Sequence, residues 1–348
     1  MLNIFITGGL GYIGSHVCSL LIEEGHNVYI LDSLKNSSFS VLRNLKIIRN
    51  SFNNSKKGFI KFFKGDIRDR NSIAAIFKYS KDIDHSIDIV LHCAGLKSVK
   101  ESLLLPKEYW NVNVEGTKIL LNEMEANGCK NIIFSSSATV YGNKKPQILK
   151  EDSEIMPANI YGKTKAYAEK ILLNKYSEKK DWKIINLRYF NPIGAHKTCL
   201  IGEESKSNYE NLFPILCKVA LKEKDFLEIY GEDWDTKDGT CIRDFIHIID
   251  IAKGHLSAIN YIINNKCHYL SINLGTAKGT TVLEIIEAFE KVTKKRINYI
   301  FKQRRVGDVA SYVASNTMAK EYLNWEPSFS LNDMCIDGWT WYLRNKKS

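Results

Sequence analysis

A tyrosine and a lysine stand four residues apart in the stretch YGKTK, as Tyr161 and Lys165. On a helix the two side chains would share a face, because positions i and i+4 are neighbours there. An ammonium beside a phenol favours the phenolate and so lowers the pKa of the phenol towards the range of a general base. The same spacing also occurs by chance in exposed helical turns. The pair therefore predicts a proton-transfer site only if other residues support it.

Ser137 gives that support. It lies in SSSATVYG, directly after an apolar run that is typical of a buried strand, and some two dozen residues before Tyr161. A hydroxyl at the end of that strand can hydrogen-bond the oxygen of a reacting substrate while Tyr161 exchanges its proton. We therefore predict Ser137, Tyr161 and Lys165 as the catalytic residues.

The start of the chain predicts a dinucleotide site. Gly8, Gly11 and Gly14 are spaced three apart in TGGLGYIG, between a predicted strand and a predicted helix. Glycines at this turn let the backbone approach a pyrophosphate, which binds at the N-terminus of the helix. Asp32 ends the second predicted strand, where its carboxylate can accept hydrogen bonds from both ribose hydroxyls and would repel a 2′-phosphate. The predicted cofactor is therefore NAD rather than NADP.

Asp66 ends the third predicted strand, in KGDIR, and two roles are open for it. Its carboxylate can meet the adenine amino group, or it can cap the helix that follows.

The elements that must position these residues alternate through the first half of the chain. Six apolar runs are typical of buried strands, namely NIFIT, VYILD, IKFFKGD, IDIVLHCAG, KNIIFSSS and KIINLRYF. Helical patterns lie between most of them, which indicates a parallel sheet covered on both faces. Ligands of such sheets bind beyond the carboxyl ends of the strands. We predict an α/β fold with a Rossmann-type doubly wound parallel sheet.

The alternation loosens after residue 192. Short strands (FLEIYG, YLSINLG, INYIFK) there mix with helices (TVLEIIEAFEKVT, SLNDMCIDGWTWYL). We predict an NAD-binding domain at 1–192 and a smaller C-terminal α/β substrate-binding domain at 193–348, with part of 236–270 returning to the first domain. The segment 46–59 is rich in Asn, Lys and Ser and is predicted to be a surface-loop insertion.

Composition excludes several classes of protein. The hydrophobic fraction of 44% and the charged fraction of 25% are typical of a globular protein, and the net charge of +10 comes from basic residues that are spread out, so no nucleic-acid partner is predicted. The eight cysteines form no Cys-x-x-Cys pair and the eight histidines form no cluster, which predicts reduced thiols and no metal site. The N-terminus lacks the basic region of a signal peptide, and no apolar run approaches the roughly 20 residues of a membrane span. We therefore predict a cytoplasmic protein with no membrane partner.

Several blocks of the sequence, in their order, resemble the UDP-glucose 4-epimerase family of the extended short-chain dehydrogenase/reductase superfamily. These blocks are GGLGYIGSH, HCAGLKSVKES, SSSATVYG, YGKTK, LRYFNPIGAH, GTCIRDFIHIIDIAKGH, NLGT and RRVGDVA. The resemblance covers nearly the whole chain, and few other families share the middle and C-terminal blocks. The segment 46–59 and positions such as Glu228 depart from the family pattern.

The resemblance implies a chemistry. Tyr161 would take the proton from the sugar 4-hydroxyl while hydride passes from C4 to NAD⁺, and Ser137 would stabilise the oxygen. The 4-keto sugar would then turn over and receive the hydride on its other face, so that UDP-galactose and UDP-glucose interconvert. The resemblance also implies a homodimer, formed through the helix that carries Tyr161 and the long helix at about 107–127.

The resemblance further implies the residues that contact each ligand. Those for the cofactor are Gly8, Gly11, Tyr12, Ile13, Gly14, Asp32, Asn36, Asp66, Ile67, Lys97, Tyr161, Lys165 and Tyr189. Those for the substrate are Lys97, Ser137, Tyr161, Asn191, Asn211, Leu212, Tyr230, Arg243, Arg305, Asp308 and Tyr312. Arg243 and Arg305 match phosphate contacts, which suits a planar guanidinium, and Asp308 matches a contact of the uridine ribose. For each of these substrate residues alone, a solvated or packing role stays open.

Tyr312 matches the position that limits the room for the sugar 2-substituent. A tyrosine there tends to exclude N-acetylated sugars, so UDP-N-acetylglucosamine and UDP-N-acetylgalactosamine are predicted to be poor substrates. The alternative is a packed strand aromatic that lies remote from the sugar.

Other functions on the same scaffold stay possible. A 4,6-dehydratase needs an Asp-Glu pair after the serine of the fifth strand, and SATVYG contains no carboxylate. The remaining alternatives are another NAD-dependent nucleotide-sugar epimerase or decarboxylase, and a non-catalytic NAD-binding protein. Proteins of the last kind usually lack the tyrosine or the lysine, and this chain has both.

Overall fold

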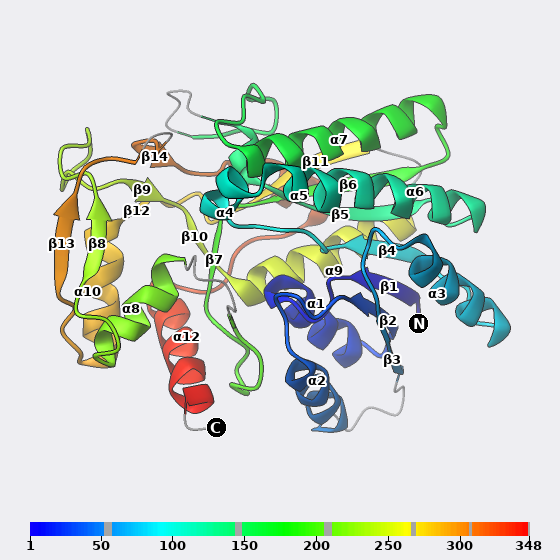
Figure 1. The fold of residues 1–348 in the computed structure, drawn as a ribbon, viewed down its shortest axis with the longest axis horizontal. Helices are drawn as coiled ribbons and strands as arrows, with labels where there is room; N and C mark the ends of the chain where they lie inside the picture. Colours follow the sequence, from blue (N-terminus) through cyan, green and yellow to red (C-terminus); the bar gives the residue numbers. More distant parts are fainter. Residues whose placement is uncertain (52–57, 143–147, 205–210, 266–268, 306–307, 347–348) are drawn as a thin grey trace.

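The computed structural model describes residues 1–51, 58–142, 148–204, 211–265, 269–305 and 308–346. Its centre is a sheet of seven strands, which are β1 (Asn3–Thr7), β2 (Asn27–Asp32), β3 (Ile60–Lys64), β4 (Ile89–His92), β5 (Asn131–Ser137), β6 (Lys183–Tyr189) and β11 (Tyr269–Leu274). The strand order is β11-β6-β5-β4-β1-β2-β3 and every pairing is parallel (Figure 1). All six residues of β2 are buried, as expected for a strand with helices on both faces. The predicted α/β doubly wound sheet is confirmed.

Helices cover both faces of the sheet (Figure 1). One face carries α1 (Tyr12–Glu23), α2 (Phe39–Ser51), α9 (Ile248–Asn264) and α11 (Thr317–Leu323). The other carries α3 (Arg70–Asp82), α6 (Gly116–Ala126) and α7 (Ile160–Glu178). Each helix turns an apolar stripe to the strands, and in α3 that stripe is formed by Ile73, Ile76 and Phe77.

The N-cap of α3 is Asp69, whose side chain accepts a hydrogen bond from the backbone N–H of Asn71 at 3.0 Å. The capping role left open for Asp66 is therefore wrong. Asp66 lies three residues earlier, and its carboxylate binds the guanidinium of Arg68 at 2.7 Å.

The surface-loop prediction for 46–59 is wrong in its first part. Residues 46–51 form the end of α2, because Leu42, Leu45 and Ile48 recur at helical spacing and are buried against the sheet. This apolar spacing outweighs the polar composition of the segment. Residues 52–57 lie outside the described part of the chain.

The strand predicted from YLSINLG belongs to the main sheet rather than to a separate C-terminal unit. It is β11, which pairs in parallel with β6 so that Tyr269 lies opposite Ile184. The preceding helix α9 packs in the core beside α1. The chain thus returns to the sheet as far as Leu274, beyond the range 236–270 given for the return. The division into two domains stays a prediction.

The remaining elements build a second core beside the carboxyl edge of the sheet. The helices are α8 (Leu212–Ala220), α10 (Val282–Thr293) and α12 (Leu331–Lys346), and the short strands are β7 (Asn191–Ile193), β8 (Leu227–Tyr230), β9 (Ile242–Arg243), β10 (Phe245–His247), β12 (Thr280–Thr281), β13 (Tyr299–Lys302) and β14 (Ser311–Tyr312). Phe213, Phe289 and Trp339 are central to this core, with Phe289 in edge-to-face contact with both other rings.

Between β4 and β5 the chain is helical almost throughout. Helices α4 (Val99–Leu104) and α5 (Pro106–Trp110) precede a π-helical turn, Asn111–Glu115, which continues directly into α6. The long helix predicted at about 107–127 corresponds to α5, the π-helical turn and α6. Among the described residues, no helix combines the length and the apolar character needed to cross a membrane. The seven cysteines within these ranges are free thiols.

Candidate active site

Tyr161, Lys165 and Ser137 meet at the carboxyl edge of the sheet. Tyr161 and Lys165 lie in the first turns of α7, whose N-cap is Asn159, and Ser137 is the last residue of β5. The Ser137 side chain lies close enough to the Tyr161 phenol to lower the pKa of that phenol. Tyr161 is 9% exposed and Lys165 5%. The helical placement inferred from YGKTK is present, and the three residues predicted to be catalytic come together.

The pKa of Tyr161 moves in the direction opposite to the one expected. Burial raises it to about 12, and the nearby Ser137 side chain only partly offsets this. Lys165 does not supply the expected stabilisation of the phenolate, because its Nζ donates a hydrogen bond to the Ser135 carbonyl at 2.8 Å. Burial also lowers the pKa of Lys165 to about 8. Desolvation thus dominates both groups.

Asn113, in the π-helical turn, is a part of this site that the sequence analysis missed. Its side chain exchanges two hydrogen bonds with the backbone of Leu96, at 2.8 and 3.0 Å, and donates a third to the Thr164 hydroxyl at 3.0 Å. The loop after β4 is thereby fixed to α7 next to Lys165. No local pattern distinguishes Asn113 from Asn111 in WNVNVEG, so only the fold reveals the role.

The turn between β1 and α1 fits a pyrophosphate. Gly8 has a φ of +68°, and a Cβ there would lie 2.7 Å from the Ala94 backbone nitrogen. A Cβ on Gly14 would lie 2.3 Å from the Gly8 carbonyl oxygen, so neither position has room for a side chain. The N-cap of α1 is Gly11, which offers no side-chain acceptor, and Tyr12 and Ile13 open the helix. The first amides of α1 are therefore not covered by a side-chain cap, as an anion site requires.

Asp32 lies beside this turn and is 7% exposed. Its carboxylate accepts hydrogen bonds from the backbone N–H of Leu10 and Leu34, both at 2.9 Å, and from the Ser37 hydroxyl at 2.7 Å. It thus joins the glycine turn to the loop after β2, in which Asn36 is exposed. This is the position where a ribose next to the pyrophosphate would lie.

The other predicted cofactor residues surround the same edge. Ile67 is buried against Gly116 of α6, where a Cβ would approach the Ile67 side chain to 2.6 Å. The Tyr189 hydroxyl lies 3.0 Å from Ser135 Oγ and 2.7 Å from His255 Nε2, in the buried layer next to Lys165. His255 is a further residue that the sequence did not single out.

Lys97 and Asn211, both predicted to bind substrate, meet at one carboxylate. Lys97 Nζ and Asn211 Nδ2 lie 3.0 and 2.7 Å from the same oxygen, Oε1 of Glu203. Leu212 follows Asn211 as the first residue of α8. Glu203 had no role in the sequence analysis.

A second group of predicted substrate residues lies around β8 and β9. The guanidinium of Arg305 lies over the ring of Tyr230, 3.4 Å from its centroid, and the Tyr230 hydroxyl donates to Glu228. The divergent residue Glu228 thus contacts a predicted substrate residue. Arg243 Nη1 donates to the carbonyls of Ile242 and Val309 at 2.8 and 3.0 Å.

Two further predicted substrate residues of this region, Asp308 and Asn191, each donate a backbone hydrogen bond. Asp308 donates its N–H to the Arg305 carbonyl at 3.1 Å. Asn191 begins β7, is exposed, and donates its N–H to the Asp244 carbonyl at 2.9 Å.

Tyr312 connects this region to Ser137, the serine predicted to be catalytic. It lies opposite Arg243 in the pairing of β14 with β9. Its hydroxyl donates to the Ala138 carbonyl at 2.9 Å and lies 3.1 Å from the Gly142 carbonyl. Ala138 directly follows Ser137, so Tyr312 is not remote from the predicted site of reaction.

Comparison with known proteins assigns the chain. The family model described as GDP-mannose 4,6 dehydratase matches residues 5–337. A UDP-glucose 4-epimerase of Bacillus subtilis (strain 168) is 40% identical over 342 residues, which are 98% of this chain and 97% of that protein. A UDP-glucose 4-epimerase from Stenotrophomonas maltophila, crystallised with NAD and formylated UDP-arabinopyranose, superposes with a TM-score of 0.93 at 39% identity and covers 100% of this chain and 99% of its own.

A third protein supports the same assignment. The UDP-glucose 4-epimerase from Bifidobacterium longum, in complex with NAD⁺ and UDP, superposes with a TM-score of 0.91 at 38% identity, covering 99% of each chain. The matched regions extend over nearly the whole length of the chain. The chain therefore belongs to the UDP-glucose 4-epimerase family.

Proposed function

We propose that the protein interconverts UDP-galactose and UDP-glucose by oxidation at C4 of the sugar, rotation of the 4-keto intermediate and reduction on its opposite face. The observation that carries this proposal is the contact between Tyr161 and Ser137 beside Lys165, at the carboxyl edge of the sheet. In a member of this family, that arrangement provides a proton acceptor and a hydrogen-bond donor for one sugar oxygen.

NAD is the cofactor in this proposal, and when bound it would supply the acceptor and the donor of the hydride at C4 of the sugar. The residues present fit the dinucleotide, because the turn of Gly8 and Gly14 leaves no room for side chains and the first amides of α1 have no side-chain cap. Asp32 would receive the ribose hydroxyls at the edge of that turn.

Tyr161 takes the proton of the 4-hydroxyl in the oxidation and returns it in the reduction. Its phenol must ionise to act as the base, and burial opposes this. The positive charge of a bound oxidised nicotinamide ring would favour the phenolate. Ser137 donates a hydrogen bond to the sugar oxygen at both stages.

The diphosphate and uridine hold the substrate while the sugar turns over. Arg243 and Arg305 supply positive charge for the diphosphate, and Tyr230 supplies a ring for the base. Asn191, Asn211, Leu212 and Asp308 complete this side of the site. We also propose that Tyr312 leaves no room for an acetamido group, so that N-acetylated UDP-sugars are poor substrates.

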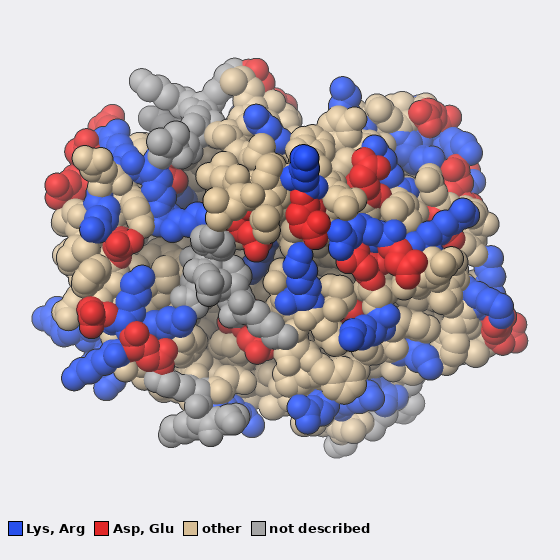
Figure 2. Space-filling view, in the orientation of Figure 1, with Lys and Arg blue, Asp and Glu red and all other residues tan. Residues whose placement is uncertain are grey.

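A cytoplasmic homodimer completes the proposal. Helices α6 and α7 lie side by side on the outside of the sheet (Figure 1), and two salt bridges join Lys175 and Lys179 to Glu125. Tyr167 and Leu173 of α7 are 43% and 42% exposed, which supports this helix pair as the contact between copies. Lys and Arg side chains are interspersed with Asp and Glu over the face seen in Figure 2, which does not favour a nucleic-acid partner.

The deciding experiment mixes the purified protein with UDP-galactose and measures the UDP-glucose that forms. Conversion to a mixture of the two sugars is the expected result. Release of carbon dioxide from UDP-glucuronate would indicate a decarboxylase instead. Retention of NAD without turnover of any UDP-sugar would indicate a non-catalytic NAD-binding protein.

A further inference from the structure

We infer that Glu203 is a positioning residue that joins the cofactor side and the nucleotide-sugar side of the site. The inference rests on the proposed function, because it acts through Lys97 and Asn211. Lys97 lies in the loop between β4 and α4, and Asn211 is the N-cap of α8. One carboxylate oxygen, Oε1 of Glu203, receives both side chains, at 3.0 and 2.7 Å.

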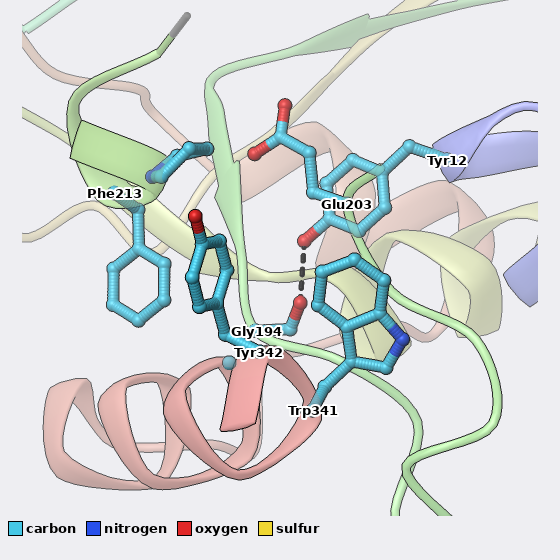
Figure 3. Close-up of a pocket in the computed structure, with 8 residues that line it drawn as sticks. Tyr12, Gly194, Glu203, Phe213, Trp341 and Tyr342 are labelled. Atoms are coloured by element: carbon cyan, nitrogen blue, oxygen red, sulfur yellow. Dashed lines mark hydrogen bonds between the residues drawn. The ribbon is translucent and has the colours of Figure 1, made fainter. Parts of the chain in front are cut away.

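The low exposure of the Glu203 carboxylate makes the hydrogen bonds from Lys97 and Asn211 necessary. Its side chain is 9% exposed, whereas that of Lys97 is 57% exposed. Glu203 lines a pocket with Tyr12, Phe213 and Trp341, and its side chain lies beside the Tyr12 ring (Figure 3). A carboxylate with so little exposure requires donors, and the ammonium and the amide provide them.

The backbone that carries Glu203 is also fixed. A Cβ on the preceding Gly202 would lie 2.4 Å from the Trp341 ring, which shows how closely the chain passes over α12. On the other side of the pocket, the Tyr12 hydroxyl donates to the Gly194 carbonyl at 2.7 Å (Figure 3). Burial raises the pKa of Tyr12, and the charge of Glu203 raises it further, so this phenol stays a donor. The surroundings of Glu203 therefore fix its position, unlike that of a mobile acidic side chain on the surface.

Two consequences follow for the proposed ligands. An ammonium has three N–H donors, so the contact with Glu203 leaves Lys97 two donors for the sugar and the cofactor. The Asn211 side chain makes no capping hydrogen bond to α8, and its Nδ2 donates to Glu203 instead. Without the carboxylate, Lys97 would turn into solvent and Asn211 would be free to cap its own helix, so both would leave their positions at once.

The test is Glu203→Gln, with Glu204→Gln as the matched control. Glu204 is the adjacent residue and is exposed. Glutamine keeps the size of the side chain but removes the charge that holds the ammonium. Since hydrogen bonds to charged groups contribute enough to change an equilibrium by about ten- to a hundredfold, we expect KM for UDP-galactose and Kd for UDP to rise by that factor. We expect kcat to change less than about threefold, and Glu204→Gln to match the wild type.

The outcomes separate this inference from the proposed function. If the wild type epimerises UDP-galactose but Glu203→Gln keeps KM and Kd within about twofold of it, Glu203 has no positioning role. A loss of Tm with KM and Kd unchanged would assign Glu203 a purely structural role and overturn the inference. If the wild type has no epimerase activity, the proposed function fails, while Kd for UDP still tests Glu203 by calorimetry.

A second set of variants applies if Glu203→Gln does not fold. Lys97→Met and Asn211→Ala each remove one donor to the shared oxygen. If Glu203 couples them, the double variant raises KM by less than the product of the two single effects. Effects that simply multiply would show that the two residues act independently and would overturn the inference.

Discussion

Arg188 of β6 and Glu169 of α7 form a two-pronged ion pair in the interior, with Nε–Oε1 at 3.0 Å and Nη2–Oε2 at 2.7 Å. Their side chains are 5% and 6% exposed. Glu169 lies one helical turn after Lys165, and Arg188 directly precedes Tyr189. The pair therefore fixes the helix that carries the proposed catalytic residues onto the strand that borders the site.

Removing one partner of this pair should strongly destabilise the fold. Arg188→Met leaves the Glu169 charge buried without its counter-ion, and we expect a loss of about 3–5 kcal/mol in the free energy of unfolding, measured by urea titration. The matched control is Lys78→Met, which removes an exposed pair with Asp82 and should cost at most about 0.5 kcal/mol. A loss below about 1 kcal/mol in Arg188→Met would mean that water reaches and solvates the carboxylate.

Tyr161→Phe should fold, keep NAD and bind UDP-sugar, yet lose most of its turnover. The variant removes the proton-transferring oxygen, and general acid–base catalysis typically contributes ~10²–10⁴-fold to a rate. Ser137→Ala should also be slow. Tyr322→Phe, at an exposed tyrosine of α11, serves as control, and kcat with UDP-galactose is the readout. Near-normal turnover in Tyr161→Phe would rule out the proposed base.

The purified protein should carry NAD, and Asp32→Ala should weaken its retention. The variant loses a carboxylate that lies beside the glycine turn and accepts three hydrogen bonds from it and from the neighbouring loop. Nucleotide released on heating can be identified and quantified against the wild type, with the exposed Asp82→Asn as control. A cofactor-free wild type that prefers added NADP would contradict the role given to Asp32.

Tyr312→Cys should open the site to N-acetylated sugars. Because the Tyr312 hydroxyl lies against the turn after Ser137, an acetamido group would overpack this region at a cost of ~1–3 kcal/mol, which lowers kcat/KM by about ten- to a hundredfold. The test compares kcat/KM for UDP-galactose and for UDP-N-acetylgalactosamine in both proteins. Equal wild-type efficiency on the two sugars would exclude Tyr312 as the gate.

Acid should destabilise the protein through its buried histidines. His92 lies between the hydroxyls of Thr7 and Thr117, at 2.8 and 2.9 Å, and burial lowers its pKa to about 3, with a smaller effect of the Lys165 charge. The unfolded chain, with a pKa near 6.5, binds the proton first. The stabilising contribution is therefore full above about pH 6.5 and is lost as the pH falls towards 3.

The difference in proton binding between the folded and the unfolded chain also provides a test. Between pH 7 and pH 4.5 the wild type should lose roughly 2–3 kcal/mol more stability than His92→Gln, measured by urea unfolding at both pH values. Equal losses in the two proteins would show that His92 is not the group that titrates.

Local sequence patterns were sufficient to predict the elements that position the site. The spacing of apolar residues predicted β1 to β6, and the glycine turn and the Tyr161–Lys165 face depend only on neighbours in the sequence. The pairing of β11 with β6 does not, since Ser271 and Asn186 meet across 85 residues. Glu203 and Lys97 are separated by 106 residues, and no periodicity links them.

The error in the pKa of Tyr161 has a related cause. The sequence shows that a lysine lies one turn away, but not how far water is excluded from both groups. It also does not show that the Ser135 carbonyl accepts a hydrogen bond from the ammonium. Electrostatics at this site therefore depends on packing that only the folded chain defines.

The late return of the chain to β11 matters while the protein is being synthesised. Until Leu274 has been translated, β6 is the last strand of the sheet, and the backbone groups along its outer side have no partner. At ~5–20 residues per second, this interval lasts on the order of ten seconds. During that time the outer edge of β6 is open and apolar in the nascent chain. A wrong strand, from the same chain or from a chain on a neighbouring ribosome, can pair with this edge.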